Sequence, residues 1–178
     1  MNSRQLVFRF VAALIVIFTA YQIGVAGLSY RVIGYREYDQ KLDAQHLAEF
    51  TATSNPTTAA ELRHCAVANT ATALSFRAEY NSLSNPNRIV EGTVGHCKMY
   101  SYVVAAAYNQ LARQRGWKTR CRVAYGQVYW FGINLHKFVS GPFFRTHDFN
   151  IIQNGKQVYA VDAILYDYFR ISTIPLRS

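Results

Sequence analysis

Residues 92–117 have the sequence GTVGHCKMYSYVVAAAYNQLARQRGW, and this stretch decides the fold. Apolar side chains recur at helical spacing from Tyr100 to Leu111, and Gly116 is a suitable left-handed cap. The pattern therefore predicts a buried helix whose first turn carries Cys97. Unpaired backbone N–H groups and the positive end of the helix dipole favour a thiolate at such a position.

After this helix the apolar pattern changes to a period of two. Residues 118–125 are predicted to form a strand with one solvent-exposed face. Cys121 lies on the other face and is expected to point into the core. Gly126 is expected to end or bulge this strand, and residues 128–131 are expected to form another. Residues 132–146 then make a long connection that we interpret as a flap beside a cleft.

A β-hairpin is predicted around Asn154-Gly155, the preferred dipeptide of a two-residue type I′ turn. If these two residues are the centre of the turn, His147 faces Asp162 at the far end of a face whose two middle pairs are apolar, and this face is expected to point into the core. Directly opposed residues have Cβ atoms about 4.5 to 5.5 Å apart, which allows a side-chain hydrogen bond. The spacing therefore predicts an imidazole–carboxylate pair.

Cys97, His147 and Asp162 together are the residue types that thiol nucleophilic catalysis requires. Cys97 would attack a carbonyl carbon, His147 would protonate the leaving amine, and Asp162 would orient the imidazole. The backbone N–H of Cys97 is a candidate oxyanion donor. Taken singly, each residue is more often a packing or surface residue, but their joint order favours a catalytic triad.

The order of these motifs resembles the transglutaminase-like superfamily, which has a papain-like fold. The resemblance covers residues 89–165 and is carried by four segments: Gly95-His96-Cys97, residues 116–123, residues 147–150 and residues 159–162. It implies an α+β fold in which a central helix begins at the cysteine and packs on an antiparallel sheet. It also implies the catalytic triad Cys97, His147 and Asp162.

The same resemblance implies that Arg120 and Asn150 are the common arginine and asparagine of the family. The chain departs from the family at Asp148, where a small or aromatic residue is usual. Trp117 and Trp130 both follow the cysteine, so no upstream tryptophan is present to act as an oxyanion donor, as in true transglutaminases. These departures favour an amide hydrolase or peptidase over a cross-linking transferase.

The N-terminal part contains 19 residues without a charge, from Phe10 to Leu28, preceded by Arg4 and Arg9. As a helix this stretch would span roughly 28 Å, close to the thickness of a bilayer core. We therefore expect a single-pass transmembrane helix, with a cleaved signal peptide as the alternative. The remainder would lie outside the cytoplasm, in the periplasm or at the cell surface, or would be secreted after cleavage.

These features divide the chain of 178 residues into three parts. Residues 1–36 are expected to be the membrane anchor and juxtamembrane segment, residues 37–88 a helical N-terminal part, and residues 89–178 the transglutaminase-like core. Two early helices are expected, over residues 35–50 and 59–80.

Composition narrows the possible functions. Apolar residues make up 51% of the chain, which excludes a disordered tail, and the net charge of +9 suits an anionic partner. The basic run from Arg113 to Arg122 lacks the interleaved aromatic side chains of a nucleic-acid platform, so a solvated face is favoured. We expect no nucleic-acid partner and no cofactor.

Three cysteines are too few for a disulfide framework, and no Cys-x-x-Cys occurs, which excludes a zinc ribbon. Neighbouring residues of a helix point in different directions, so His64-Cys65 and His96-Cys97 do not predict a metal site. Cys65 and Cys121 either form a disulfide in an exported protein or are separate core thiols.

Two functions from different classes remain. The first is a membrane-anchored cysteine enzyme that acts on amide bonds of a protein or peptide substrate through a thioester acyl-enzyme. The second is a non-enzymatic binding or accessory subunit of a membrane complex that keeps the fold. An acetyltransferase that uses a coenzyme A thioester is less well supported, because no nucleotide-binding loop is recognisable.

Overall fold

The structure is a computed structural model, and it describes residues 3–52, 54–78, 82–138 and 145–177. The fold belongs to the α+β class, as the sequence predicted. Its main sheet has five antiparallel strands in the order β1-β4-β6-β7, with β5 paired to the end of β4. These strands are β1 (Leu28–Arg36), β4 (Thr119–Trp130), β5 (Ile133–Asn134), β6 (His147–Asn154) and β7 (Gln157–Val161).

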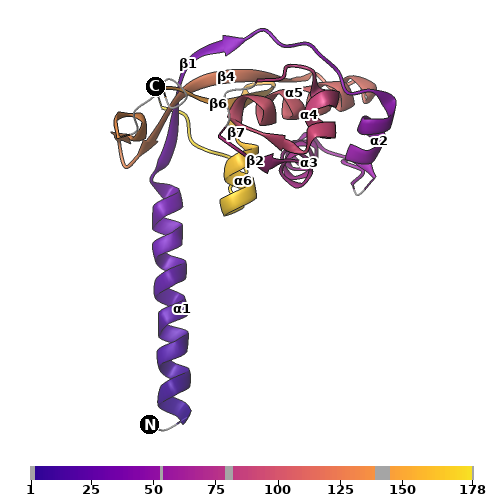
Figure 1. The fold of residues 1–178 in the computed structure, drawn as a ribbon. Coiled ribbons are helices and arrows are strands. Elements are labelled where there is room, and N and C mark those ends of the chain that lie inside the picture. Colours follow the sequence, from indigo (N-terminus) through magenta and orange to yellow (C-terminus); the bar gives the residue numbers. More distant parts are fainter. Residues whose placement is uncertain (1–2, 53, 79–81, 139–144, 178) are drawn as a thin grey trace.

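Helix α1 (Ser3–Ala26) projects away from the rest of the molecule (Figure 1). Among the residues that the structure describes, no helix is both long and apolar enough to cross a bilayer. The prediction of a transmembrane helix is therefore wrong. It placed the whole uncharged stretch in one helix, whereas α1 ends at Ala26 and Leu28 begins β1.

Strand β1 pairs with β4 along its whole length, from Leu28 opposite Trp130 to Arg36 opposite Val123. Residues 28–36, which we had assigned to the juxtamembrane segment, are thus an edge strand of the main sheet. Side chains of β1 consequently reach both faces of the sheet, and two of them enter the site described below.

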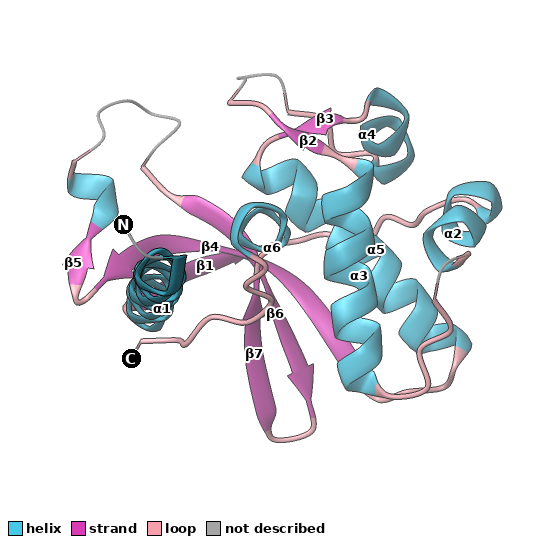
Figure 2. Ribbon diagram, turned by 90° about the horizontal axis from the view of Figure 1, so that it is seen from below, coloured by secondary structure: helices cyan, strands magenta, loops and turns pink. Residues whose placement is uncertain are grey.

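One face of the sheet is covered by helices, with α5 (Cys97–Gln114) against β4 and β6 and α3 (Ala59–Ala73) beside it (Figure 2). Helix α5 begins at Cys97, and Gly116 beyond its end has a φ of 67°, so the predicted start and cap are confirmed. Its buried alanine and valine side chains pack in one core with Cys121 and Ile152. The smaller helices are α2 (Ala44–Thr51), α4 (Pro86–Gly92), the 3₁₀ turn η1 (Leu135–Lys137) and α6 (Ala163–Phe169).

The opposite face carries a second core, formed by Tyr30, Phe149, Ala160 and their neighbours. The C-terminal segment covers this second core and bonds to both edge strands of the sheet, β1 and β7. Ile174 N donates to the carbonyl of Ala160 in β7 at 3.0 Å, and Tyr30 N in β1 donates to the carbonyl of Pro175 at 2.9 Å. Both faces of β6 are therefore buried, whereas the sequence pattern had suggested one core-facing side.

The β6–β7 hairpin forms at the predicted place, but its turn lies one residue later. Asn154 pairs with Gln157, so Gly155 and Lys156 are the central residues, and Gly155 has a φ of 61°. Glycine at the first central position is typical of a type II′ turn. The pairing moves by two residues as a result, which preserves the face of each side chain. His147 and Asp162 share a face but are not directly opposed.

Strand β4 continues through Gly126 to Trp130, where we had expected the strand to end or bulge and residues 128–131 to form another strand. The irregularity lies in β1 instead, where the register shifts between Val32 and Gly34. A β-carbon on Gly126 would lie 2.0 Å from the carbonyl oxygen of Arg31. Glycine is needed here because the two backbones approach closely.

The early helices are shorter than predicted. The first begins at residue 44 as α2, and the second, α3, ends at residue 73. A two-residue strand, β2 (Ser75–Phe76), then pairs in parallel with β3 (Val94–Gly95). This pair ties the end of α3 to the residues before Cys97 and fixes where α5 begins. Residues 139–144 of the predicted flap lie outside the described residues.

Candidate active site

Cys97 is the first residue of α5, and the residue is 8% exposed. His96, which precedes it, has an extended backbone and makes no side-chain cap with the helix. The first-turn N–H groups of a helix have no partner within the helix. They therefore add positive potential around the sulfur atom of Cys97.

The imidazole and carboxylate come from the β6–β7 hairpin. His147 is the first residue of β6, and its Nε2 bonds Oδ2 of Asp162, which follows β7 directly. Asp162 also caps α6, because its Oδ1 accepts from the backbone N–H groups of Ile164 at 2.8 Å and Leu165 at 3.2 Å. One oxygen thus anchors the carboxylate and the other orients the ring.

The side chain of His147 and the backbone N–H of Asp148 both lie close enough to the sulfur of Cys97 to lower the pKa of its thiol. Because Nε2 of His147 is bound to Asp162, Nδ1 is the ring nitrogen left for the sulfur. The structure therefore brings all three predicted site residues together in one series, with His147 between Cys97 and Asp162.

The electrostatics of this series favour a thiolate and an imidazolium. Burial raises the pKa of the Cys97 thiol, but hydrogen bonds with His147 and His96 outweigh it and lower this pKa to about 6. Burial lowers the pKa of His147, yet the charge of Asp162 holds that pKa well above its ordinary value. Burial also disfavours the ionised form of Asp162, but the charge of His147 keeps the pKa of this carboxyl below its ordinary value. At neutral pH the sulfur is the deprotonated partner.

Tyr30 is a fourth member of the site, and the sequence analysis missed it. Its hydroxyl donates to Oδ2 of Asp162 at 2.5 Å, the oxygen that also bonds His147. Burial and the charge of Asp162 raise the pKa of Tyr30, so its hydroxyl stays protonated and remains a donor. The alternation of Tyr30 and Val32 was a signal for a strand, but the neighbouring apolar stretch directed the interpretation towards a membrane.

Arg36 and Asp148 form an ion pair that was also missed. Nε of Arg36 bonds Oδ1 of Asp148, and its Nη2 lies 3.2 Å from Oδ2. The same Oδ2 is 4.0 Å from Sγ of Cys97. A second carboxylate therefore lies beside the sulfur, and Arg36 offsets its charge. The sequence analysis had noted Asp148 only as a departure from the family.

The other residues that the resemblance singled out lie elsewhere. The amide Nδ2 of Asn150 donates to the carbonyl of Ser101 at 2.9 Å, which ties β6 to α5. Arg120 is exposed on β4. The indole N–H of Trp130 donates to the carbonyl of Gly24 at 3.0 Å, and this hydrogen bond joins β4 to the last turn of α1.

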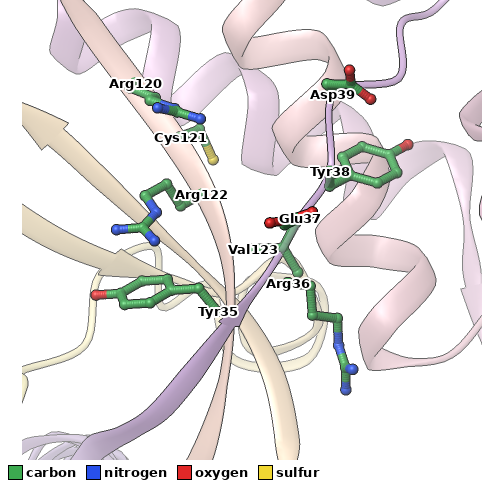
Figure 3. A pocket seen from close by; sticks show the side chains of 9 residues that line it. All are labelled: Tyr35, Arg36, Glu37, Tyr38, Asp39, Arg120, Cys121, Arg122 and Val123. Carbon is green, nitrogen blue, oxygen red and sulfur yellow. The ribbon is translucent and has the colours of Figure 1, made fainter.

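A pocket of about 720 Å³ lies where β1 ends, between residues 35–39 and residues 120–123 (Figure 3). Charged side chains of both signs line it. Figure 3 shows Arg36 turned away from Arg120 and Arg122. This orientation agrees with its ion pair to Asp148.

All three cysteines are free thiols, so Cys65 and Cys121 do not form a disulfide. Cys121 is buried in the core, and burial raises the pKa of its thiol far above the ordinary value. Within the described ranges, no group of three or more His, Cys, Asp or Glu side chains is arranged to hold a metal ion.

Comparison of the chain with protein-family models, curated proteins and solved structures finds no match. Its class therefore has to be argued from fold and site alone. These define an α+β protein with a cysteine–histidine–aspartate constellation at the start of its central helix.

Proposed function

We propose that this protein is a transglutaminase-like cysteine enzyme that acts on amide bonds of peptides or proteins. The observation that carries the proposal is the series Cys97–His147–Asp162, in which a thiol of lowered pKa meets an imidazole held by a carboxylate. Hydrolysis is favoured over cross-linking, because Trp117 and Trp130 both follow Cys97 in the sequence, unlike the upstream tryptophan donor of true transglutaminases.

In the acylation step, the thiolate of Cys97 attacks the amide carbon. A C–S bond forms, and the carbonyl π electrons move to the oxygen. The backbone N–H of Cys97 would stabilise this oxyanion, and the ring of His96, which contacts the thiol, is the candidate second donor. The C–N bond then breaks, and His147 gives its proton to the leaving nitrogen.

In the deacylation step, neutral His147 accepts a proton from water as the water oxygen bonds to the thioester carbon. The C–S bond breaks, which releases a carboxylic acid and restores the thiolate and imidazolium. Throughout both steps, Asp162 keeps the ring oriented, with one oxygen anchored by α6.

Labelling with an electrophilic vinyl sulfone, followed by peptide mapping, tests the nucleophile. All three thiols are buried, but Cys97 should be labelled fastest, because His147 lowers the pKa of its thiol, whereas burial raises the pKa of Cys121. His147→Ala should slow labelling of Cys97 by about 100-fold. Equal rates at the three thiols would overturn the proposal.

Intact-mass measurement on mixtures with activated acyl amides tests acyl transfer itself. A thioester on the wild-type chain that is absent from Cys97→Ala supports an enzyme. The alternative is an accessory binding subunit, which the low exposure of the thiol favours. If no thioester forms on the wild-type chain, and if the Cys97→Ser variant copurifies with the same partners as the wild-type chain, that alternative is established instead.

A further inference from the structure

The pocket at the end of β1 adjoins a second hollow that shares Tyr38, Asp39 and Arg120 with it and extends to Arg113. We call the two together the β4 groove. It arises because β1 stops pairing with β4 at Arg36, after which residues 37–40 diverge from the sheet. The groove is therefore a built feature of the topology.

Arginine side chains dominate the β4 side of this groove. Neither Arg120 nor Arg122 forms an ion pair with a carboxylate among the described residues. The guanidinium of Arg122 lies 3.6 Å from the ring centroid of Tyr35. Stacking of this kind restrains the side chain while it leaves N–H groups for an oxyanion. Lys118 lies in a further hollow that also contains Arg120.

The opposite side carries Glu37 and Asp39, together with Tyr38. A uniform polyanion would meet these two carboxylates, which would repel it. A peptide can avoid this conflict, because its acidic side chains can reach the β4 arginines while its backbone N–H groups face the acids. The mixed charge of the groove therefore favours an acidic peptide over a nucleic acid.

The backbone edge of β4 in this groove is already occupied at Cys121. Nδ2 of Asn109 donates to the carbonyl of Cys121 at 2.8 Å, and Oδ1 of Asn109 accepts from its N–H at 2.8 Å. A ligand strand consequently cannot add to the sheet there, and recognition has to use side chains.

One residue, Arg36, is shared by the groove and the candidate active site. Arg36 contributes to the wall of the groove, and the guanidinium of this residue holds Asp148 beside the sulfur of Cys97.

We propose that the β4 groove binds an acidic segment of the peptide substrate, with its carboxylates on Arg120 and Arg122. The identification of this ligand as a substrate rests on the proposed function, but the binding of an acidic peptide does not.

Fluorescence anisotropy with the full-length Cys97→Ala variant tests binding without chemistry. The probes are three labelled peptides of equal length, in which serine alternates with aspartate, asparagine or lysine. The aspartate peptide should bind tightest. The double variant Arg120→Gln/Arg122→Gln should weaken it by about tenfold, since each exposed ion pair contributes up to about fivefold. Arg88→Gln, an exposed arginine on α4, is the matched control and should change nothing.

Urea unfolding of each variant shows that the exposed substitutions preserve the fold. Equal affinity for the aspartate and asparagine peptides would overturn the inference, as would an unchanged affinity of the double variant. Tighter, arginine-dependent binding of polyuridylate or of anionic lipid vesicles would also overturn it. Peptide binding without any thioester on the wild-type chain would refute the proposed function alone, whereas a thioester without acidic preference would refute this inference alone.

Discussion

The hydroxyl of Tyr30 donates to Oδ2 of Asp162 at 2.5 Å, although the two residues lie 132 positions apart. Strand β1 supplies the tyrosine, and the C-terminal segment holds it in place through both of its backbone groups: its N–H donates to Pro175, and its carbonyl accepts from Arg177. The carboxylate that orients His147 is therefore fixed by the first strand and the last segment of the chain together.

Replacing Tyr30 with phenylalanine removes this hydroxyl and keeps the ring. We expect the free energy of unfolding to fall by about 1.5–3 kcal/mol, because a hydrogen bond to a buried charged group is lost. Tyr108→Phe is the matched control, since its hydroxyl bonds the neutral side chain of Thr119 and should contribute only about 0.5–1.5 kcal/mol. Urea denaturation measures both variants. Equal losses would argue against a charged acceptor for Tyr30.

The reactivity of Cys97 should depend on pH in two directions. Its pKa is lowered to about 6, so the rate of alkylation by iodoacetamide should be half-maximal near that pH and fall as the sulfur is protonated below it. Amide turnover should also fall at alkaline pH, when His147 loses its proton above its raised pKa. His147→Ala should move the alkylation midpoint back towards about 8.5, the ordinary value of a thiol. A wild-type midpoint already at that value would contradict the thiolate–imidazolium assignment.

Arg36 should act on the thiol through Asp148. Arg36→Gln leaves an uncompensated carboxylate 4.0 Å from Sγ of Cys97, which disfavours the thiolate. We expect the alkylation midpoint to rise by about one pH unit or more. Arg36→Lys retains the positive charge and should shift the midpoint much less.

The double variant Arg36→Gln/Asp148→Asn separates charge from structure. Removal of both charges should return the midpoint to the wild-type value or below it. If the double variant keeps the raised midpoint of Arg36→Gln, the arginine acts by shaping the site and the electrostatic explanation fails.

Gly126→Ala should separate β1 from β4. The added methyl group would lie 2.0 Å from the carbonyl oxygen of Arg31, a backbone atom that cannot move without breaking the strand pairing. We expect a lower thermal midpoint together with slower labelling of Cys97, because Tyr30 and Arg36 both come from β1. Gly92→Ala is the control, since no atom lies within 4 Å of its added carbon. If Gly126→Ala is less stable but its Cys97 is labelled at the wild-type rate, β1 does not support the site.

Local patterns were sufficient for the central helix and for the hairpin. The helical period, the cap at Gly116 and the two-residue turn are interactions between residues close in sequence, so their signals are visible without a fold. The exact pairing of the hairpin could not be predicted from these local patterns, because Asn154-Gly155 fits more than one turn type. The error of two residues left His147 and Asp162 on the same face, since side chains in a strand alternate with a period of two.

The amino-acid sequence alone determined which three groups could form a nucleophilic site and where Cys97 would stand on its helix. Tertiary structure decided what surrounds them, because Tyr30, Arg36 and the C-terminal segment act through pairings between distant parts of the chain. It also decided against the membrane-spanning prediction. Short-range periodicity reports which side of an element is apolar, whereas the partner of that side, and the charges beside a buried thiol, depend on how strands far apart in sequence come together.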